Sequence, residues 1–308
     1  MTSQAPYAVV IGAVNVDLCG RPFAAPVACD SNPGRVTTSL GGVGRNIAHN
    51  LRLLGVPVTF ITALGGDAHA EEIRRSCAHL GIDLSCADYA PDMNTSTYLY
   101  ITDEHGDLVL AVCDTDVSGC ITPAYLEKYL DVLNGAALVV IDANLAPQTI
   151  TWICENCTAP LFADPVSAAK APRLREGLGR LHTFKPNRIE AELLTGVEIT
   201  GEASMRRAVD ALLDAGIKRV YLSLGSDGVY CGDGETYAHL PILPTPLINA
   251  TGAGDSFMAA LAWSYLQGLD TAGSALAGLA AASITLESYA AINSQLSAEL
   301  LKARMRRE

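Results

Sequence analysis

Short apolar runs alternate along the chain with segments whose apolar residues recur every three or four positions. The runs are rich in β-branched residues and predict buried strands, whereas the longer segments have the period of amphipathic helices. The predicted strands are residues 7–13, 58–63, 137–142, 161–164 and 220–224. The predicted helices are residues 44–54, 68–80, 123–133, 190–195, 203–215 and 256–267. This alternation predicts a mainly parallel sheet with helices on both faces.

Two stretches depart from this alternation, residues 19–40 and 93–112. Each alternates apolar and polar residues around turn-forming residues, as antiparallel hairpins do. We expect residues 1–308 to form a single α/β domain, with a small β-sheet lid inserted from residues 15–40 and 93–113. A long apolar stretch at 257–286 is divided by polar residues into segments too short to cross a bilayer, so two buried helices are expected there.

Composition narrows the range of partners. The 308 residues are 49% hydrophobic and carry 33 acidic against 21 basic side chains, a net charge of −12. This balance disfavours nucleic acid and anionic membranes as partners, yet backbone N–H groups can still bind a small phosphorylated ligand. The nine cysteines lie scattered through apolar runs, which favours reduced, buried thiols and a cytoplasmic protein.

Two glycine-rich segments precede predicted helices. Residues 251–255 (Thr-Gly-Ala-Gly-Asp) would let backbone N–H groups and a helix N-terminus converge on an anion. Residues 40–46 (Leu-Gly-Gly-Val-Gly-Arg-Asn) would allow a ligand close to the backbone. Each is equally compatible with a plain turn: Asp255 could be a helix cap, and the second segment could pack a helix closely on a strand. Neither spacing fits a P-loop.

Five segments together give the chain a resemblance to the ribokinase family of sugar and nucleoside kinases, also called the phosphofructokinase-B family. They are residues 12–17, 41–46, 185–190, 223–228 and 249–255, in the family's order and across nearly the whole chain. The resemblance implies a ribokinase-like three-layer α/β/α sandwich with a mainly parallel central sheet and a small β-sheet lid. It also implies that the protein transfers phosphate from ATP to a small molecule.

The resemblance assigns roles at the phosphate end of the site. Asp255 is similar to the family's catalytic base, and the backbone of Gly252, Ala253 and Gly254 would hold the transferring phosphoryl group. Asn187 and Glu190 would hold Mg²⁺ against the ATP phosphates, although their spacing fits a helix capping box equally well. The other nucleotide-binding positions implied are Ser223, Gly225, Gly228, Thr251 and Asn293, with residues 280–293 lining the adenine pocket. Asn249 stands where the family has an Asp in its monovalent-cation loop, which leaves potassium activation open.

On the acceptor side, the resemblance implies a sugar site near the end of the first strand. Its residues are Asn15, Asp17, Gly41, Gly42, Arg45, Asn46 and, more weakly, Asn144. The lid residues Asp30, Ser31, Asn32, Asn94 and Thr95 are expected to contact a base, and favour pseudouridine as the acceptor. Residues 30–34 could equally be only a turn. Another nucleoside, ribose or another sugar is the alternative acceptor. A non-catalytic nucleoside-binding protein is a further class that Asp255 disfavours, and a homodimer through the lid is expected from the family.

Overall fold

The computed structural model describes residues 6–306, in which nine strands form a central sheet. Pairing is parallel except at one edge, where β14 and β15 add antiparallel pairs. In spatial order the strands are β15 (Tyr237–Leu240), β14 (Val229–Gly232), β13 (Arg219–Ser223), β12 (Leu181–Phe184), β11 (Leu161–Asp164), β10 (Leu138–Asp142), β1 (Ala8–Ile11), β4 (Val58–Ile61) and β6 (Ile82–Asp83). Both faces of this sheet are covered, which explains why its strands are nearly continuous apolar runs.

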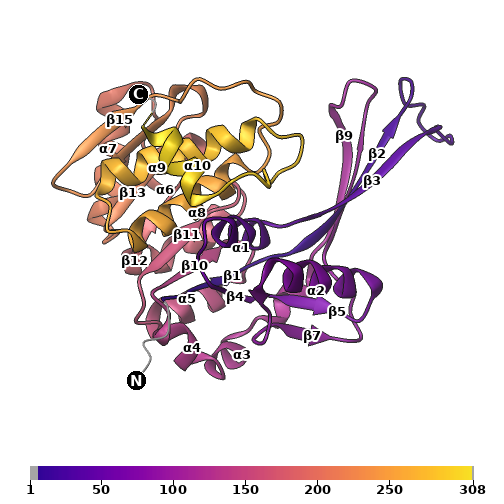
Figure 1. Cartoon of the computed structure of the whole chain (residues 1–308), viewed down its shortest axis with the longest axis horizontal. Coiled ribbons are helices and arrows are strands. Elements are labelled where there is room, and N and C mark those ends of the chain that lie inside the picture. Colours follow the sequence, from indigo (N-terminus) through magenta and orange to yellow (C-terminus); the bar gives the residue numbers. More distant parts are fainter. Residues whose placement is uncertain (1–5, 307–308) are drawn as a thin grey trace.

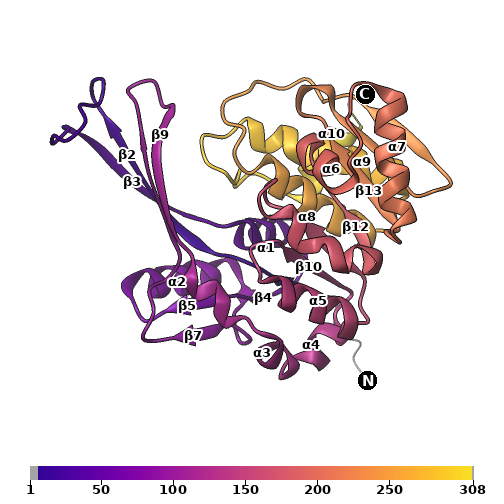
Figure 2. The ribbon, with the colours of Figure 1, turned by 180° about the vertical axis from the view of Figure 1, so that it is seen from behind.

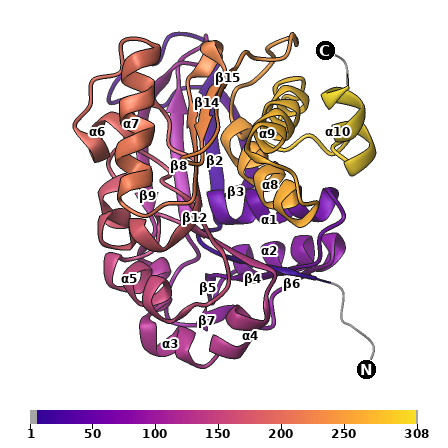
Figure 3. The same cartoon turned by 90° about the vertical axis from the view of Figure 1, so that its left-hand side faces the viewer.

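Alternate side chains of each strand enter two separate cores. In β1, Ala8 and Val10 belong to one hydrophobic cluster, whereas Val9 and Ile11 belong to the other. This follows from the two-residue period of a strand, which sends successive side chains to opposite faces. The sheet is therefore the middle layer of three (Figure 3).

Helices cover each face of the sheet. One face carries α1 (Val43–Leu53), α2 (Ala68–Leu80), α8 (Ala253–Leu266), α9 (Thr271–Leu286) and α10 (Ala298–Met305). The other face, toward the viewer in Figure 2, carries α3 (Pro123–Glu127), α4 (Leu130–Gly135), α5 (Pro147–Asn156), α6 (Arg188–Thr195), α7 (Glu202–Asp214) and the 3₁₀ segment Ala171–Arg180. No helix within residues 6–306 combines the length and apolar character needed to cross a membrane.

A second, four-stranded sheet projects from the body of the molecule (Figure 1). It contains two antiparallel hairpins joined by a parallel pairing of β2 with β8. Its order is β3 (Gly34–Gly41), β2 (Asn15–Pro22), β8 (Thr97–Thr102) and β9 (Leu108–Asp114). We call it the small sheet. A further two-stranded sheet pairs β5 (Ala63–Gly65) with β7 (Asp88–Ala90).

The fold class predicted from the sequence is confirmed, with differences in single elements. The expected helix at 123–133 is two helices, because the backbone at Tyr129 (φ −119°, ψ 16°) leaves the helical region. The helix expected from residue 256 begins at Ala253, so Gly254 and Asp255 lie inside its first turn. Strands β12, β14 and β15 were not predicted, and β12 and β15 differ from the predicted strands in that histidine or threonine interrupts their short apolar runs.

Candidate active site

Three buried charged residues lie where central strands of the large sheet end. Asp142 ends β10 and Asp164 ends β11, and the two are partners in the parallel register. Lys185 follows β12 directly, and its Nζ lies 3.2 Å from Oδ2 of Asp164. Burial by itself lowers the pKa of Lys185, but Asp164 and the nearby Glu190 outweigh burial and raise it. The lysine therefore supplies a fixed positive charge among these acids.

The first turn of α8 brings Asp255 to the same place. Gly252 caps this helix in the left-handed region (φ 82°), and a Cβ there would also meet the Ala291 carbonyl oxygen. Burial raises the pKa of Asp255 to about 7, and Asp164 adds to the effect. Hydrogen bonding from Asn46 and the charge of Lys185 act in the opposite direction. A carboxyl group in this environment can take up and release a proton near neutral pH.

A cavity of about 500 Å³ opens beside this helix terminus. Of the residues that the resemblance assigned to phosphate and nucleotide binding, the lining includes Asn187, Ser223, Gly225, Gly228, Ala253 and Gly254. Its apolar lining comes from the loop before α8, from α8 and from α9: Leu243, Leu247, Phe257, Leu279 and Leu286. A polar end at a helix N-terminus and an apolar end suit a ligand with phosphates and a planar base.

Asn293 lies elsewhere than expected. The cavity lining found within residues 6–306 contains Ala282, Ser283 and Leu286 from the predicted adenine segment but not Asn293. The Asn293 amide instead donates to the Ile284 carbonyl (2.7 Å). Thr251 is exposed just before α8, and its N–H donates to Asn249.

The capping box at the start of α6 is present. Asn187 Oδ1 accepts from the Glu190 N–H (2.9 Å), and Glu190 Oε2 accepts from the Asn187 N–H (2.8 Å). Glu190 is only 4% exposed, and burial raises its pKa. These bonds are those of the helix capping box, the alternative that the spacing left open. Asn187 also faces the cavity. A magnesium role for the pair stays a prediction.

The expected sugar-binding residues gather between the two sheets. The Asn15 amide donates to Asp17 Oδ1 (2.9 Å) on β2. A Cβ on Gly41 would lie 2.1 Å from Asp17 Oδ2, so only glycine leaves room for this carboxylate. Gly42 has φ 96°, which favours glycine, and begins α1. Asn46, one turn into α1, donates to Asp255 and so joins α1 to the first turn of α8.

Arg45 does not point into that site. It is 6% exposed, and its guanidinium donates to the Leu40 carbonyl (2.9 Å) and Ser76 Oγ (3.3 Å). Leu40 begins the glycine-rich segment and Ser76 lies in α2, so Arg45 links that segment to α2.

Several expected base-contacting residues already use their hydrogen-bonding groups within the protein. The Asn32 amide accepts from the Val27 N–H and donates to the carbonyls of Val27 and Asp30. The Asp30 side chain accepts from the Ser31 N–H. This turn lies at the far end of the β2–β3 hairpin (Figure 1). Thr95 is fully buried and bonds to Asp67 and Gly65, and Asn94 beside it is exposed. The turn alternative therefore accounts for Asn32, and a structural role accounts for Thr95.

Asn144 is occupied as well. Its Oδ1 accepts a hydrogen bond from Lys170, and Arg173 donates to its carbonyl (3.0 Å). These contacts, together with a side-chain hydrogen bond from Asn144 to Asp142, hold the loop after β10.

Sequence reasoning missed Lys185, Asp142 and Asp164 as site residues. The signal was present, because each stands at the carboxyl end of a parallel strand, the edge at which ligands bind in open α/β sheets. Lys185 begins one of the five segments that carry the resemblance, but it was given no role because the strand before it was not predicted.

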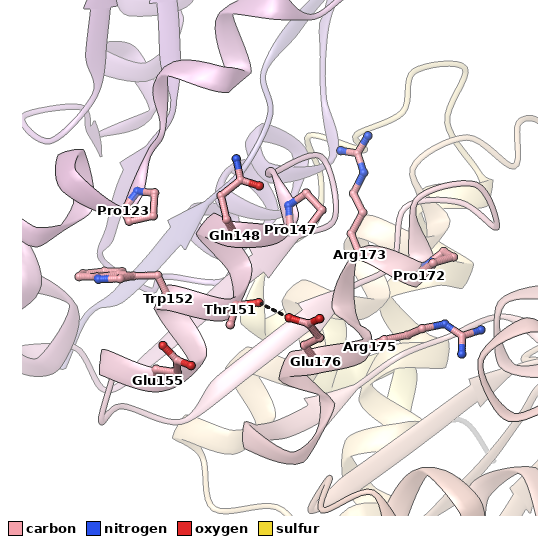
Figure 4. Close-up of a pocket in the computed structure, with 10 residues that line it drawn as sticks. All are labelled: Pro123, Pro147, Gln148, Thr151, Trp152, Glu155, Pro172, Arg173, Arg175 and Glu176. Carbon is pink, nitrogen blue, oxygen red and sulfur yellow. Dashed lines mark hydrogen bonds between the residues drawn. The ribbon is translucent and has the colours of Figure 1, made fainter.

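A second hollow lies on the outside of the molecule between α5 and the 3₁₀ segment (Figure 4). Trp152, Arg173 and Glu176 contribute to its walls, and Thr151 contacts Glu176 (3.4 Å). None of the expected catalytic or binding residues lines it within the described chain. It is larger, at about 740 Å³, but carries no buried acid or glycine-rich loop.

The fold and this site define a phosphotransferase of the kind that acts on sugars and nucleosides. A profile of pfkB family carbohydrate kinases matches residues 5–298, and the chain belongs to this family. The pseudouridine kinase of Escherichia coli K12 is 38% identical over 266 residues, which cover 85% of each chain.

Two further comparisons agree. An uncharacterized sugar kinase of the same bacterium, YeiI, is 35% identical over 303 residues, covering 96% of this chain and 83% of its own. The structure of Arabidopsis thaliana ribokinase, solved with ribose and ATP, superposes with a TM-score of 0.88 over 99% of this chain and 100% of its own. At 22% identity that likeness concerns the fold. The protein is a ribokinase-fold sugar or nucleoside kinase.

Proposed function

We propose that this kinase transfers the γ-phosphoryl group of ATP to the 5′-hydroxyl of pseudouridine, giving pseudouridine 5′-phosphate. The observation that carries the proposal is the position of Asp255, which directly follows the cavity-lining Gly254 and accepts a hydrogen bond from Asn46 of the expected sugar site. The 38% identity to a pseudouridine kinase supports this acceptor. Another nucleoside, ribose or another sugar is the alternative, supported by the similarity to a sugar kinase.

In the proposed step, Asp255 accepts the proton of the 5′-hydroxyl as its oxygen attacks the γ-phosphorus. The bond from that phosphorus to the β,γ-bridging oxygen breaks, and ADP leaves with the electron pair. Lys185, Ala253 and Gly254 all line the cavity, so in the proposed step the Lys185 ammonium group and the backbone N–H groups of Ala253 and Gly254 would stabilise the negative charge on the phosphoryl oxygens. Phosphoryl transfer needs mainly positioning and charge stabilisation, which these groups supply.

Asn187 and Glu190 fit a magnesium site by donor chemistry, since amide and carboxylate oxygens suit this ion and Asn187 faces the cavity. Mg²⁺ bound there would neutralise phosphate charge. Potassium is less well supported, because Asn249 already holds the Thr251 N–H (2.9 Å) and the Tyr289 carbonyl (2.9 Å).

The small sheet supports a nucleoside acceptor. Asp17 is the register partner of Tyr98, and Cys19 that of Tyr100, so both tyrosines share the face of the small sheet that carries Asp17. Their rings stack with centroids 5.2 Å apart. Burial and Cys19 raise the pKa of Tyr100 to about 12, so its hydroxyl stays protonated and can both donate and accept. We propose that this face contacts the base while Asn15 and Asp17 hold the ribose.

The opposite face of the small sheet is apolar. Val36, Leu110 and Val112 are 74%, 61% and 58% exposed, an arrangement that water disfavours. We propose that a second copy of the chain covers it, giving a homodimer through the lid, and that Leu110→Lys yields monomers in light scattering.

All nine cysteines are free thiols, which supports the reducing cytoplasm as the location of the protein.

A substrate panel tests the proposal. The full chain is assayed with labelled ATP and Mg²⁺, with and without K⁺, against pseudouridine, uridine, adenosine and ribose. We expect the highest kcat/KM for pseudouridine, and Asp255→Asn as a control should lose all these activities together. Equal kcat/KM for uridine or ribose would refute pseudouridine and favour the alternative.

A further inference from the structure

Asp142 is the most deeply buried acid near the site, yet the reaction proposed above gives it no task. It is 1% exposed and ends β10, an interior strand of the large sheet. Its Oδ2 accepts from the N–H groups of Ala13 and Gly44, each at 2.9 Å, and its Oδ1 accepts from the Asn144 N–H at 2.9 Å. Backbone N–H groups supply these three bonds, and the Asn144 side chain contributes a further hydrogen bond.

The two partners of Oδ2 belong to different loops. Ala13 lies two residues before Asn15, in the loop that leads from β1 into the small sheet. Gly44 lies in the first turn of α1, two residues before Asn46. One carboxylate oxygen therefore ties together the two segments that carry the proposed sugar-binding residues. The negative charge also sits at the N-terminus of α1, where the helix dipole stabilises it.

The surrounding glycines show how closely this junction is packed. A Cβ on Gly12 would lie 2.3 Å from Asp142 Oδ2, and a Cβ on Gly44 would lie 2.9 Å from the Gly12 backbone. Any side chain at Gly12 would push the carboxylate away from its partners. The neighbouring acid, Asp164, instead pairs with Lys185 on the nucleotide side. Asp142 and Asp164 are register partners at one sheet edge, yet Asp142 holds the loops of the acceptor side and Asp164 pairs on the nucleotide side.

We propose that Asp142 is a positioning residue that fixes the separation of the β1–β2 loop and the first turn of α1, and so sets the geometry of the acceptor site without touching the acceptor. The proposal rests on the acceptor site proposed above, but not on pseudouridine as the compound bound there. It holds for whichever acceptor the wild-type enzyme phosphorylates best.

Asp142→Asn tests it, because an amide cannot accept from all three N–H groups and carries no charge at the helix terminus. We expect the KM for the acceptor to rise about tenfold, with the KM for ATP within about twofold of wild type. Amide hydrogen exchange, measured without substrate, should accelerate at Ala13 and Gly44. The matched control is Asp233→Asn: this acid also collects N–H and hydroxyl donors, from Glu235, Thr236 and Thr271, but at the β14–β15 turn. It should lower Tm only.

The proposal is wrong if Asp142→Asn raises both KM values by the same factor, or leaves both KM values and the exchange rates unchanged. Gly12→Ala is the second variant, since it keeps the carboxylate but displaces it, and should reproduce the rise in acceptor KM. If neither variant folds, Asp142 is required for the fold itself and the positioning role is refuted. A failure of pseudouridine in the substrate panel affects none of these readouts.

Discussion

The amide nitrogen of Asn46 lies 2.8 Å from Oδ2 of Asp255, joining α1 to α8 across 209 positions of the chain. This hydrogen bond favours the ionised carboxylate, whereas burial favours the protonated acid and raises the pKa to about 7. The protonation state of the proposed base therefore depends on a residue that the sequence placed in the sugar site.

This balance predicts a pH dependence. Because Asp255 must be ionised to accept a proton, kcat should rise with pH through an apparent pKa of about 7. Asn46→Ala removes a bond that lowers the pKa, so the acidic limb should move to higher pH. The pH profile of kcat at saturating acceptor and ATP measures this. An unmoved limb in the variant would show that the contact does not control ionisation.

Replacing the base separates activity from stability. Asp255→Asn should lower kcat by about a hundredfold or more, with ATP binding retained. Because the pKa of Asp255 is higher in the folded than in the unfolded chain, ionisation is unfavourable in the folded state. Asp255 therefore lowers the free energy of unfolding increasingly as pH rises from the pKa of the unfolded chain toward about 7. The variant should therefore have a higher Tm than wild type at pH 8, and a smaller difference at pH 4. Wild-type turnover in the variant would remove Asp255 from catalysis.

The sequence was informative about the fold because long, strongly periodic segments have only one way to bury their apolar faces. The helix at 68–80 was predicted with the bounds it has in the structure. The strand β12 was missed because His182 and Thr183 interrupt its apolar run. Missing β12 also hid Lys185 at its end.

Side-chain engagement was harder to predict than residue placement. Asp17 and Asn46 were expected in one sugar site, and the structure brings Asp17 against Gly41 of the glycine loop and Asn46 against Asp255. Asn32 and Thr95 were expected to face a ligand, but turn and strand-end hydrogen bonds use their polar atoms first. Local sequence cannot show which of several competing partners a polar group finds.

Glu190 allows the magnesium and capping roles to be separated. In Glu190→Gln the amide oxygen can still accept from the Asn187 N–H, so the cap is largely kept while the charge is lost. We expect the Mg²⁺ concentration for half-maximal rate to rise. A fall in Tm with an unchanged Mg²⁺ titration would mean that Glu190 only caps α6.

Lys185 should be needed for both stability and turnover. Lys185→Met leaves Asp164 buried without its counter-charge, which costs about 3–5 kcal/mol in comparable buried pairs. Adding Asp164→Asn should restore much of the unfolding free energy but not kcat. Denaturant unfolding and steady-state rates of the two single variants and the double variant give the coupling. Full activity in the double variant would limit the pair to a structural role.

The last prediction concerns selectivity for pseudouridine over uridine, which differ only in the ring atom joined to ribose. Pseudouridine presents a free N–H where uridine has its glycosidic nitrogen, so a pocket that pairs this N–H must offer an acceptor. With uridine that acceptor faces carbon, and an unpaired buried polar group costs about 1–3 kcal/mol, or roughly tenfold to hundredfold in kcat/KM.

Tyr98 and Tyr100 can supply such an acceptor, because a tyrosine hydroxyl both donates and accepts hydrogen bonds and both residues lie on the face of the small sheet that carries Asp17. Tyr98→Phe and Tyr100→Phe keep the stacked rings but remove one hydroxyl each, so at least one should reduce the preference for pseudouridine about tenfold while activity on uridine changes little. Asn32→Ala is the matched control, since its amide serves the distal turn and its loss should leave the preference intact. If Asn32→Ala abolishes the preference and both tyrosine variants retain it, the base is read from the hairpin turn, and the tyrosine face is not the base site.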